Sequence, residues 1–171
     1  MSRRIGMLVA VVSVAAALWA AAPANGGTLD FGPPGQPGIG NFAPVALNGT
    51  PVLTSIAIDP FSVIDSTGAG AGWNVNLTVS DLVSGASRIP ASSMSMGAAV
   101  VAPADGASMT GVVAHATTGN LGSGAKIVTA NVGDGQGTYL VSPAIVTLTI
   151  PPNAAAGNYA ATATIAVVSG P

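Results

Sequence analysis

The chain has 171 residues, of which 49% are hydrophobic and only 6% charged, and it contains no cysteine. The missing cysteine excludes disulfides, thiol catalysis and cysteine metal sites. Four basic residues are too few for the basic patch that nucleic acid requires, and the high hydrophobicity with low net charge indicates a folded chain.

Residues 1–24 have the features of a secretory signal. Arg3 and Arg4 give a positive N-terminal region, residues 7–22 form an apolar run, and small residues precede a cleavage point near Ala24. The run has the length of a signal core and is short for a bilayer span, although a retained anchor is the alternative. We therefore expect a secreted, extracellular chain without a membrane span after cleavage.

Residues 25–50 are rich in proline and glycine. We expect one short strand at residues 28–31, followed by a loop. The segment is expected to be loose, so it could donate a strand to the sheet edge of a neighbouring molecule.

Residues 51–171 read as a series of short strands separated by glycine, proline and aspartate turns. The expected strands are residues 52–58, 61–64, 72–82, 94–101, 110–116, 126–132, 139–141, 145–150 and 158–168. No apolar period typical of a helix persists. The pattern predicts an all-β chain folded as an immunoglobulin-like antiparallel β-sandwich.

The segment after a glycine-rich turn at residues 68–72 alternates strictly. One face is apolar (Trp73, Val75, Leu77, Val79) and the other is polar (Asn74, Asn76, Thr78, Ser80). This period of two predicts a strand with one buried and one wet face. Because the other inward positions are mostly alanine and valine, we expect Trp73 and the few remaining aromatic residues to fill most of the core.

The last two expected strands form a unit. The stretch from Ile150 to Tyr159, with Gly157 two residues before the tyrosine, resembles the penultimate corner of bacterial immunoglobulin-like sandwiches, where a tyrosine pins a loop. The alternative is a simple hydrophobic strand that contains a tyrosine. Both interpretations place Tyr159 at the edge of the core.

No group of residues in the sequence indicates a catalytic or metal site. The only histidine, His115, lies on an expected strand, and no serine nucleophile motif occurs. The loop around Asp134 faintly resembles calcium loops but lacks further acidic ligands, so turn chemistry explains it better. We therefore expect neither enzymatic activity nor a cofactor.

Three stretches resemble the WxL-domain family of cell-surface proteins. Asp65 leads through glycines into Gly72, Trp73 and Val75, as in the first motif of the family. Residues 157–171 are similar to the family's closing segment, and residues 27–32 are similar to its opening. In this chain Val75 replaces the leucine of the first motif. In the second motif, Ile165 stands at the tryptophan position and Val167 at the leucine position.

The resemblance implies a sandwich fold and non-covalent attachment to the peptidoglycan of Gram-positive bacteria. The motif residues Trp73, Val75, Ile165 and Val167 would then be wall contacts or core residues. The phase of Trp73 with its apolar neighbours favours the core. Structural roles are expected for Asp65, Gly72, Gly157 and Tyr159.

We therefore expect a secreted, non-catalytic cell-surface protein whose partners are cell-wall glycan or envelope proteins. The alternative is a structural subunit of an extracellular fibre or surface layer assembled by strand exchange. Low charge weakens repulsion between copies, so self-association is compatible with either hypothesis.

Overall fold

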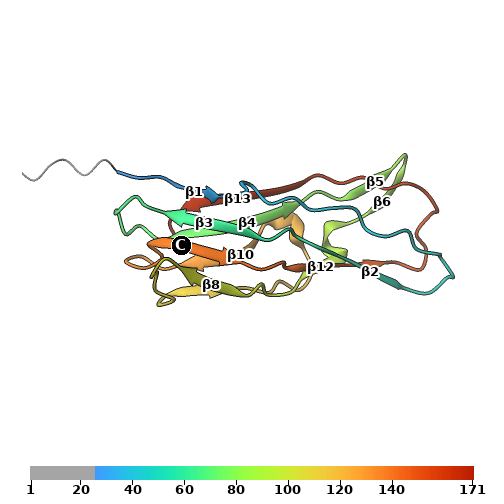
Figure 1. Ribbon diagram of the computed structural model, residues 1–171. Helices are drawn as coiled ribbons and strands as arrows, with labels where there is room; N and C mark the ends of the chain where they lie inside the picture. Colours follow the sequence, from blue (N-terminus) through green and yellow to red (C-terminus); the bar gives the residue numbers. More distant parts are fainter. Residues whose placement is uncertain (1–25) are drawn as a thin grey trace, which may run out of the picture.

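The computed structural model describes residues 26–171, so the expected signal at residues 1–24 lies outside the described part. The described residues form an elongated, nearly all-β molecule with two three-residue 3₁₀ turns, η1 (Ala91–Ser93) and η2 (Leu121–Ser123) (Figure 1). Every strand pairing is antiparallel. This confirms the predicted all-β sandwich. Between residues 26 and 171, no helix is long and apolar enough to cross a membrane.

One layer of the sandwich consists of two sheets joined end to end. The first has the order β1-β3-β11-β8 and contains β1 (Leu29–Gly32), β3 (Phe61–Asp65), β11 (Gly137–Val141) and β8 (Val101–Ala104). The second has the order β2-β12-β7 and contains β2 (Val52–Ala57), β12 (Ile145–Ile150) and β7 (Met94–Met96). We call these two sheets together layer A.

Chain order shows why the two sheets of layer A are continuous. β2 runs into β3, β11 into β12, and β7 into β8, each across a short break. Pro60 and Pro143 lie in two of these breaks. Proline has no N–H for the ladder, so it interrupts a strand where it occurs. Proline therefore explains two strand breaks that were expected from the sequence: the break between residues 52–58 and 61–64, and the break between residues 139–141 and 145–150.

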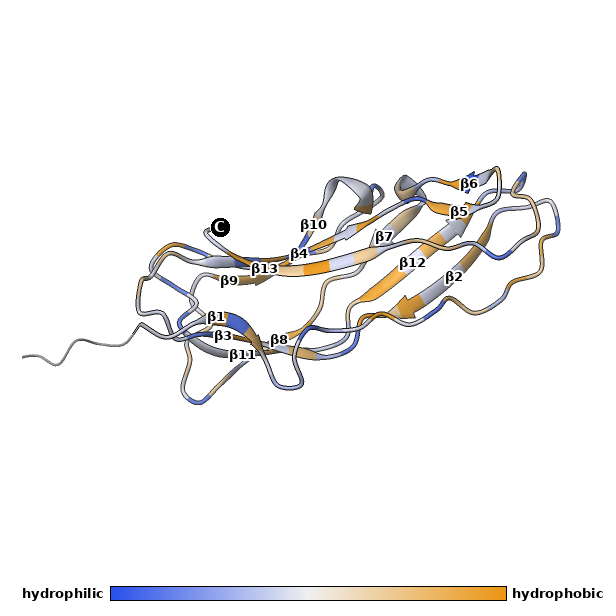
Figure 2. Cartoon of the chain, turned by 90° about the horizontal axis from the view of Figure 1, so that it is seen from above, coloured by the Kyte–Doolittle hydropathy of each residue, from blue (hydrophilic) through white to orange (hydrophobic). Residues whose placement is uncertain are grey.

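Layer B faces layer A (Figure 2). Its main sheet has the order β13-β4-β10-β9 and contains β13 (Ala163–Ser169), β4 (Trp73–Val79), β10 (Ala125–Ala130) and β9 (Val112–Ala114). Beyond β4, the layer continues as the hairpin of β5 (Leu82–Ser84) and β6 (Ser87–Ile89).

Several expected strand boundaries were wrong. The expected strand at 72–82 divides into β4 and β5, and the expected strand at 94–101 divides into β7 and β8. The last strand begins at Ala163 rather than at residue 158, because the preceding residues form a loop. β6 was not predicted, since its three residues are too few to show a period.

The N-terminal segment is held within its own chain. β1 pairs with β3, and the Gln36 side-chain amide donates to the Ile165 carbonyl at 2.7 Å. Ile39 forms a bridge with Ile58, while Phe42 and Val45 pack against the core. The expectation of a loose donor segment is therefore wrong for residues 29–45.

The molecule has two halves along its length, and they differ in the size of the side chains that fill their cores. The buried aromatic side chains are Phe61, Trp73 and Tyr139, which belong to the half built on β3, β4 and β11. The rings of Trp73 and Tyr139 lie 5.6 Å apart at an angle of 56°. The half built on β2, β12 and the β5–β6 hairpin has no aromatic residue among its buried side chains, with Phe42 and Tyr159 only partly buried there, and we call it the distal half.

Candidate functional site

The motif residues singled out from the sequence are core residues. Trp73 and Val75 are completely buried, Ile165 is 4% exposed, and Val167 is partly buried. β13 pairs with β4, which sets Val167 opposite Val75. Of the two interpretations of Trp73, burial agrees with the structure. Any contact surface for a partner must lie elsewhere.

Two glycines make room for the indole of Trp73. The indole Nε1 donates to the Gly135 carbonyl at 2.7 Å, and a Cβ on Gly135 would lie 2.7 Å from that nitrogen. Gly72 has φ +72°, and its Cβ would meet the Ala130 carbonyl at 2.5 Å. Glycine alone tolerates both constraints. The structural role of Gly72 was expected, whereas that of Gly135 was not predicted from the sequence.

Asp65 holds the turn that follows β3. Its carboxylate is 4% exposed and accepts hydrogen bonds from the backbone N–H of Thr67 at 3.0 Å and from its hydroxyl at 2.6 Å. This is the Asx-type turn for which aspartate is favoured. The carboxylate therefore serves to order the loop that leads to Trp73.

Tyr159 and Gly157 shape the loop between β12 and β13. The Tyr159 hydroxyl donates to the Ala155 carbonyl at 3.0 Å, so the tyrosine pins this loop. A Cβ on Gly157 would lie 2.6 Å from the Ser84 hydroxyl of β5, which shows how closely the loop approaches the hairpin. Reciprocal backbone hydrogen bonds between Ala160 and Val83 fasten the two together. The loop is thus a fixed wall of the distal half.

The phenol of Tyr139 lies in surroundings that disfavour its ionised form. Burial raises the pKa of its phenol, and the carboxylates of Asp134 and Asp65 raise it further. Its hydroxyl donates to the Ser108 carbonyl at 2.7 Å. The phenol is therefore neutral at physiological pH and acts as a buried hydrogen-bond donor.

A broad polar surface covers the outside of layer B. Because Trp73 and its apolar neighbours on β4 point inward, the alternate residues point outward. The register adds outward residues from β13, β10 and β9. We call this the polar sheet face: Asn74, Asn76, Thr78, Lys126, Thr129, Thr164 and His115. Asn74 and Thr129 are themselves buried, 6% and 9% exposed, so they support the face from below.

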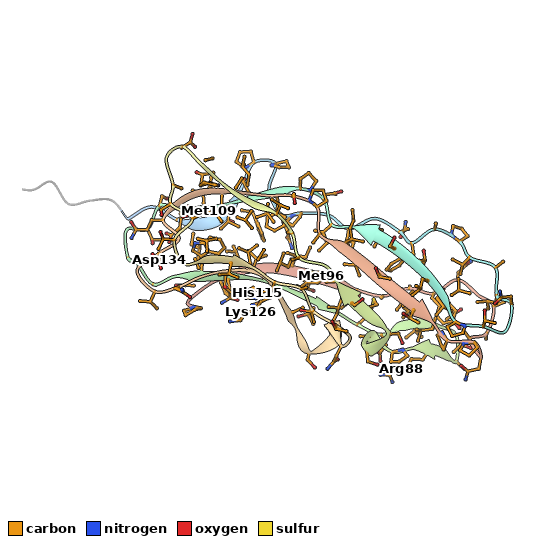
Figure 3. The ribbon with its side chains drawn as sticks, turned by 90° about the horizontal axis from the view of Figure 1, so that it is seen from below. Arg88, Met96, Met109, His115, Lys126 and Asp134 are labelled. Carbon is orange, nitrogen blue, oxygen red and sulfur yellow. The ribbon has the colours of Figure 1, made fainter. Side chains whose placement is uncertain are left out.

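Hydrogen bonds fix the centre of the polar sheet face. The Asn76 side-chain amide donates to the Asn74 side-chain oxygen at 2.6 Å, and Asn74 in turn donates to the Gly170 carbonyl. The His115 Nε2 lies 2.8 Å from the Thr129 hydroxyl. The His115 backbone N–H donates to the carbonyl of Ile127, the residue after Lys126, and Figure 3 shows Arg88 well apart from both at the distal end. The side chains are thus held in place, while Thr78, Lys126 and Thr164 are exposed.

The distal half contains a cleft between layers A and B. Its volume is about 710 Å³. We call it the distal cleft. It is lined by three groups of residues: Ile39, Gly40, Asn41, Phe42, Pro44, Val45 and Leu47 of the N-terminal segment; Thr54, Val79, Leu82, Ile89, Met94, Val146, Leu148 and Ile150 of the strands; and Ala154, Ala155, Ala156, Gly157, Asn158, Tyr159, Ala160, Ala161 and Ala163 of the loop into β13.

The volume of the distal cleft shows whether it is a sealed void or an open cleft. A sealed, dry void costs about 24 cal/mol per Å³, so a void of about 710 Å³ would cost about 17 kcal/mol. The whole net stability of a domain is about 5–15 kcal/mol. The cleft is therefore a space open to solvent or to a ligand rather than a packing defect.

The described residues offer no metal centre. From residue 26 onward, no three histidine, cysteine, aspartate or glutamate side chains lie close enough together to hold an ion. Asp134 lies in a turn, where its N–H donates to the Asn131 carbonyl at 3.0 Å. The interpretation of that loop as turn chemistry therefore agrees with its geometry.

A comparison of the chain with protein-family models finds no match, and a comparison with curated protein sequences finds none either. The function must be argued from the two surfaces described above.

Proposed function

We propose that this chain is an exported, non-catalytic surface module that associates non-covalently with the cell envelope. Its contact surface is the polar sheet face, and its ligand is cell-wall glycan. The observation that supports the proposal is the ordered set of amides, hydroxyls, an imidazole and an ammonium group on one side of a four-stranded sheet.

The chemistry of this face matches that of a glycan. Sugar hydroxyls both donate and accept hydrogen bonds, and side-chain amides and hydroxyls do the same. Thr78 and Thr164 are directly paired and exposed, and Lys126 adds a cation for acidic groups of the wall. Val113 and Val168, 49% and 42% exposed, flank the face and offer apolar contact to sugar C–H groups. Because the partly buried Asn76 is already fixed by its hydrogen bond to the buried Asn74, binding would order few side chains.

Sedimentation with purified peptidoglycan tests the proposal. The protein used is residues 26–171, which contain the core cluster and the strands described above. Wild-type protein should appear in the pellet with the wall. Thr78→Glu places a bulky charge in the polar sheet face and should lower the bound fraction at least fivefold.

Thr149→Glu is the matched control, because Thr149 is an exposed strand threonine on layer A. This variant should bind as wild type does. Recovery of wild-type protein entirely in the supernatant would refute wall binding. Equal loss of binding in both variants would show that the contact is not at the polar sheet face.

The open edge of β2 favours a second candidate, a subunit of an extracellular fibre or layer. β2 pairs only with β12, and Leu53 on it is 67% exposed. The strand contains no charged residue and no proline, the two features that commonly protect sheet edges. The β2 strands of two copies could therefore pair. This differs from donation of the N-terminal strand, which is occupied within its own chain, and its consequence is reversible self-association.

A further inference from the structure

We propose that the distal cleft binds the aliphatic chain of a neutral lipid-like amphiphile and leaves the polar head in solvent. This site is separate from the polar sheet face and goes beyond the proposed function. The inference is argued from the composition of the lining, from its charge and from the hydrogen bonding of its floor.

The cleft exists because small residues line it where large ones would be needed to fill it. The loop from residue 154 to Ala163 contributes six alanines and a glycine to the lining. The bulkiest core pair, Trp73 and Tyr139, lies in the other half of the molecule. Protein interiors are normally packed with few voids larger than a water molecule. The wide space at this point is therefore bounded by side chains too small to fill it.

The floor of the cleft is aliphatic. Met94, Val146 and Leu148 are at most 2% exposed and Ile150 is 7% exposed, so these four side chains lie beneath the cleft, while most of its exposed lining comes from residues 39–47 and 154–163. None of the described lining residues is charged. Such a surface favours an uncharged apolar guest, because a buried charge would find no partner there. The volume of about 710 Å³ lies within the range of roughly 300–1,000 Å³ that small-molecule sites occupy.

The rim differs from the floor. Asn41 and Asn158 are exposed lining residues, and their amides can hydrogen-bond to a polar group at the mouth. The Tyr159 hydroxyl is occupied by the Ala155 carbonyl, so its ring rather than its hydroxyl is free to contact the guest. An apolar interior with an amide rim matches an amphiphile whose chain is inside and whose head is outside.

A lipid chain fits this cleft better than a peptide strand does. β12, which supplies Val146, Leu148 and Ile150, is hydrogen-bonded to β2 on one side and to β7 on the other. Its backbone groups are therefore already paired and cannot receive those of a peptide. A peptide placed between the layers would carry unsatisfied N–H and C=O groups, which are costly to bury. A hydrocarbon chain has none.

The test uses residues 26–171 and N-phenyl-1-naphthylamine, a neutral probe whose fluorescence rises in apolar surroundings. We expect saturable binding of the probe and its displacement by monopalmitoylglycerol, but not by glycerol, which is the head group alone. The double variant Ala154→Leu, Ala163→Leu adds bulk inside the cleft without removing a contact. It should bind monopalmitoylglycerol at least tenfold more weakly than wild type.

Ala102→Leu is the matched control, because Ala102 is exposed on β8 outside the cleft, and it should bind as wild type does. Thermal unfolding of each variant establishes that it is folded. Absence of probe binding to wild-type protein would overturn the proposal. Equal affinity in the double variant and wild type would do the same. Displacement by the apolar peptide Val-Thr-Leu-Thr-Ile but not by monopalmitoylglycerol would assign the cleft to a peptide instead.

Discussion

Replacing Trp73 tests the claim that this residue organises the core rather than the contact surface. The side chain is completely buried, packs against Tyr139 and donates a hydrogen bond to the Gly135 carbonyl. Truncation of a buried tryptophan to alanine costs about 3–5 kcal/mol, and leaving a buried acceptor unpaired costs about 1–3 kcal/mol. Because the two effects overlap, we expect Trp73→Ala to lose about 4–6 kcal/mol of unfolding free energy.

The assay is urea unfolding of residues 26–171 followed by far-ultraviolet circular dichroism. With a slope of about 2 kcal/mol per molar urea, the expected loss lowers the midpoint by about 2–3 M. Trp73→Phe keeps an aromatic ring but removes the indole N–H, so it should lose less than Trp73→Ala. Val113→Ala, at a half-exposed position on β9, should stay within about 0.5 kcal/mol of wild type. An unchanged midpoint for Trp73→Ala would refute the reasoning.

Two further predictions concern Tyr139 and the β2 edge. Since the folded pKa of Tyr139 is raised, its contribution to stability is complete below the unfolded tyrosine pKa of about 10 and is lost as pH rises through the folded pKa. Unfolding midpoints measured across this alkaline range should fall less steeply in Tyr139→Phe than in wild type or Tyr159→Phe, and equal slopes would contradict the assignment. Sedimentation velocity should show self-association of wild type that Leu53→Lys weakens and Val113→Lys does not; a strictly monomeric wild type at high concentration would count against edge pairing.

The strands with a strict alternation were predictable from the sequence. Trp73, Val75 and Leu77 alternate with polar residues, and that pattern alone implied their burial and the polar outer face of β4. The loop between β12 and β13 that Tyr159 pins was also predictable, because Gly157 and Tyr159 lie close together in that one loop. In both cases the information is local to a few consecutive residues.

The two candidate sites were less predictable, because each depends on register between distant strands. Nothing near Lys126 indicates that it lies beside Asn76, and the irregularity between Lys126 and Val128 changes the phase of β10. The distal cleft likewise depends on residues 39–47 and 154–161, which are distant in sequence and meet only in the folded chain as parts of one lining. The alanine run at residues 154–156 was the one local signal, since small residues there leave volume unfilled.

The measurement that tests the central claim most directly is a map of the glycan contact by nuclear magnetic resonance. Isotope-labelled residues 26–171 would be titrated with soluble peptidoglycan fragments while backbone amide and side-chain amide signals are recorded. The account predicts that the largest shifts occur at Asn76, Thr78, Lys126 and Thr164, with no change at Trp73 or Leu148. Shifts confined to layer A or to the distal cleft, or an absence of shifts at saturating glycan, would contradict it.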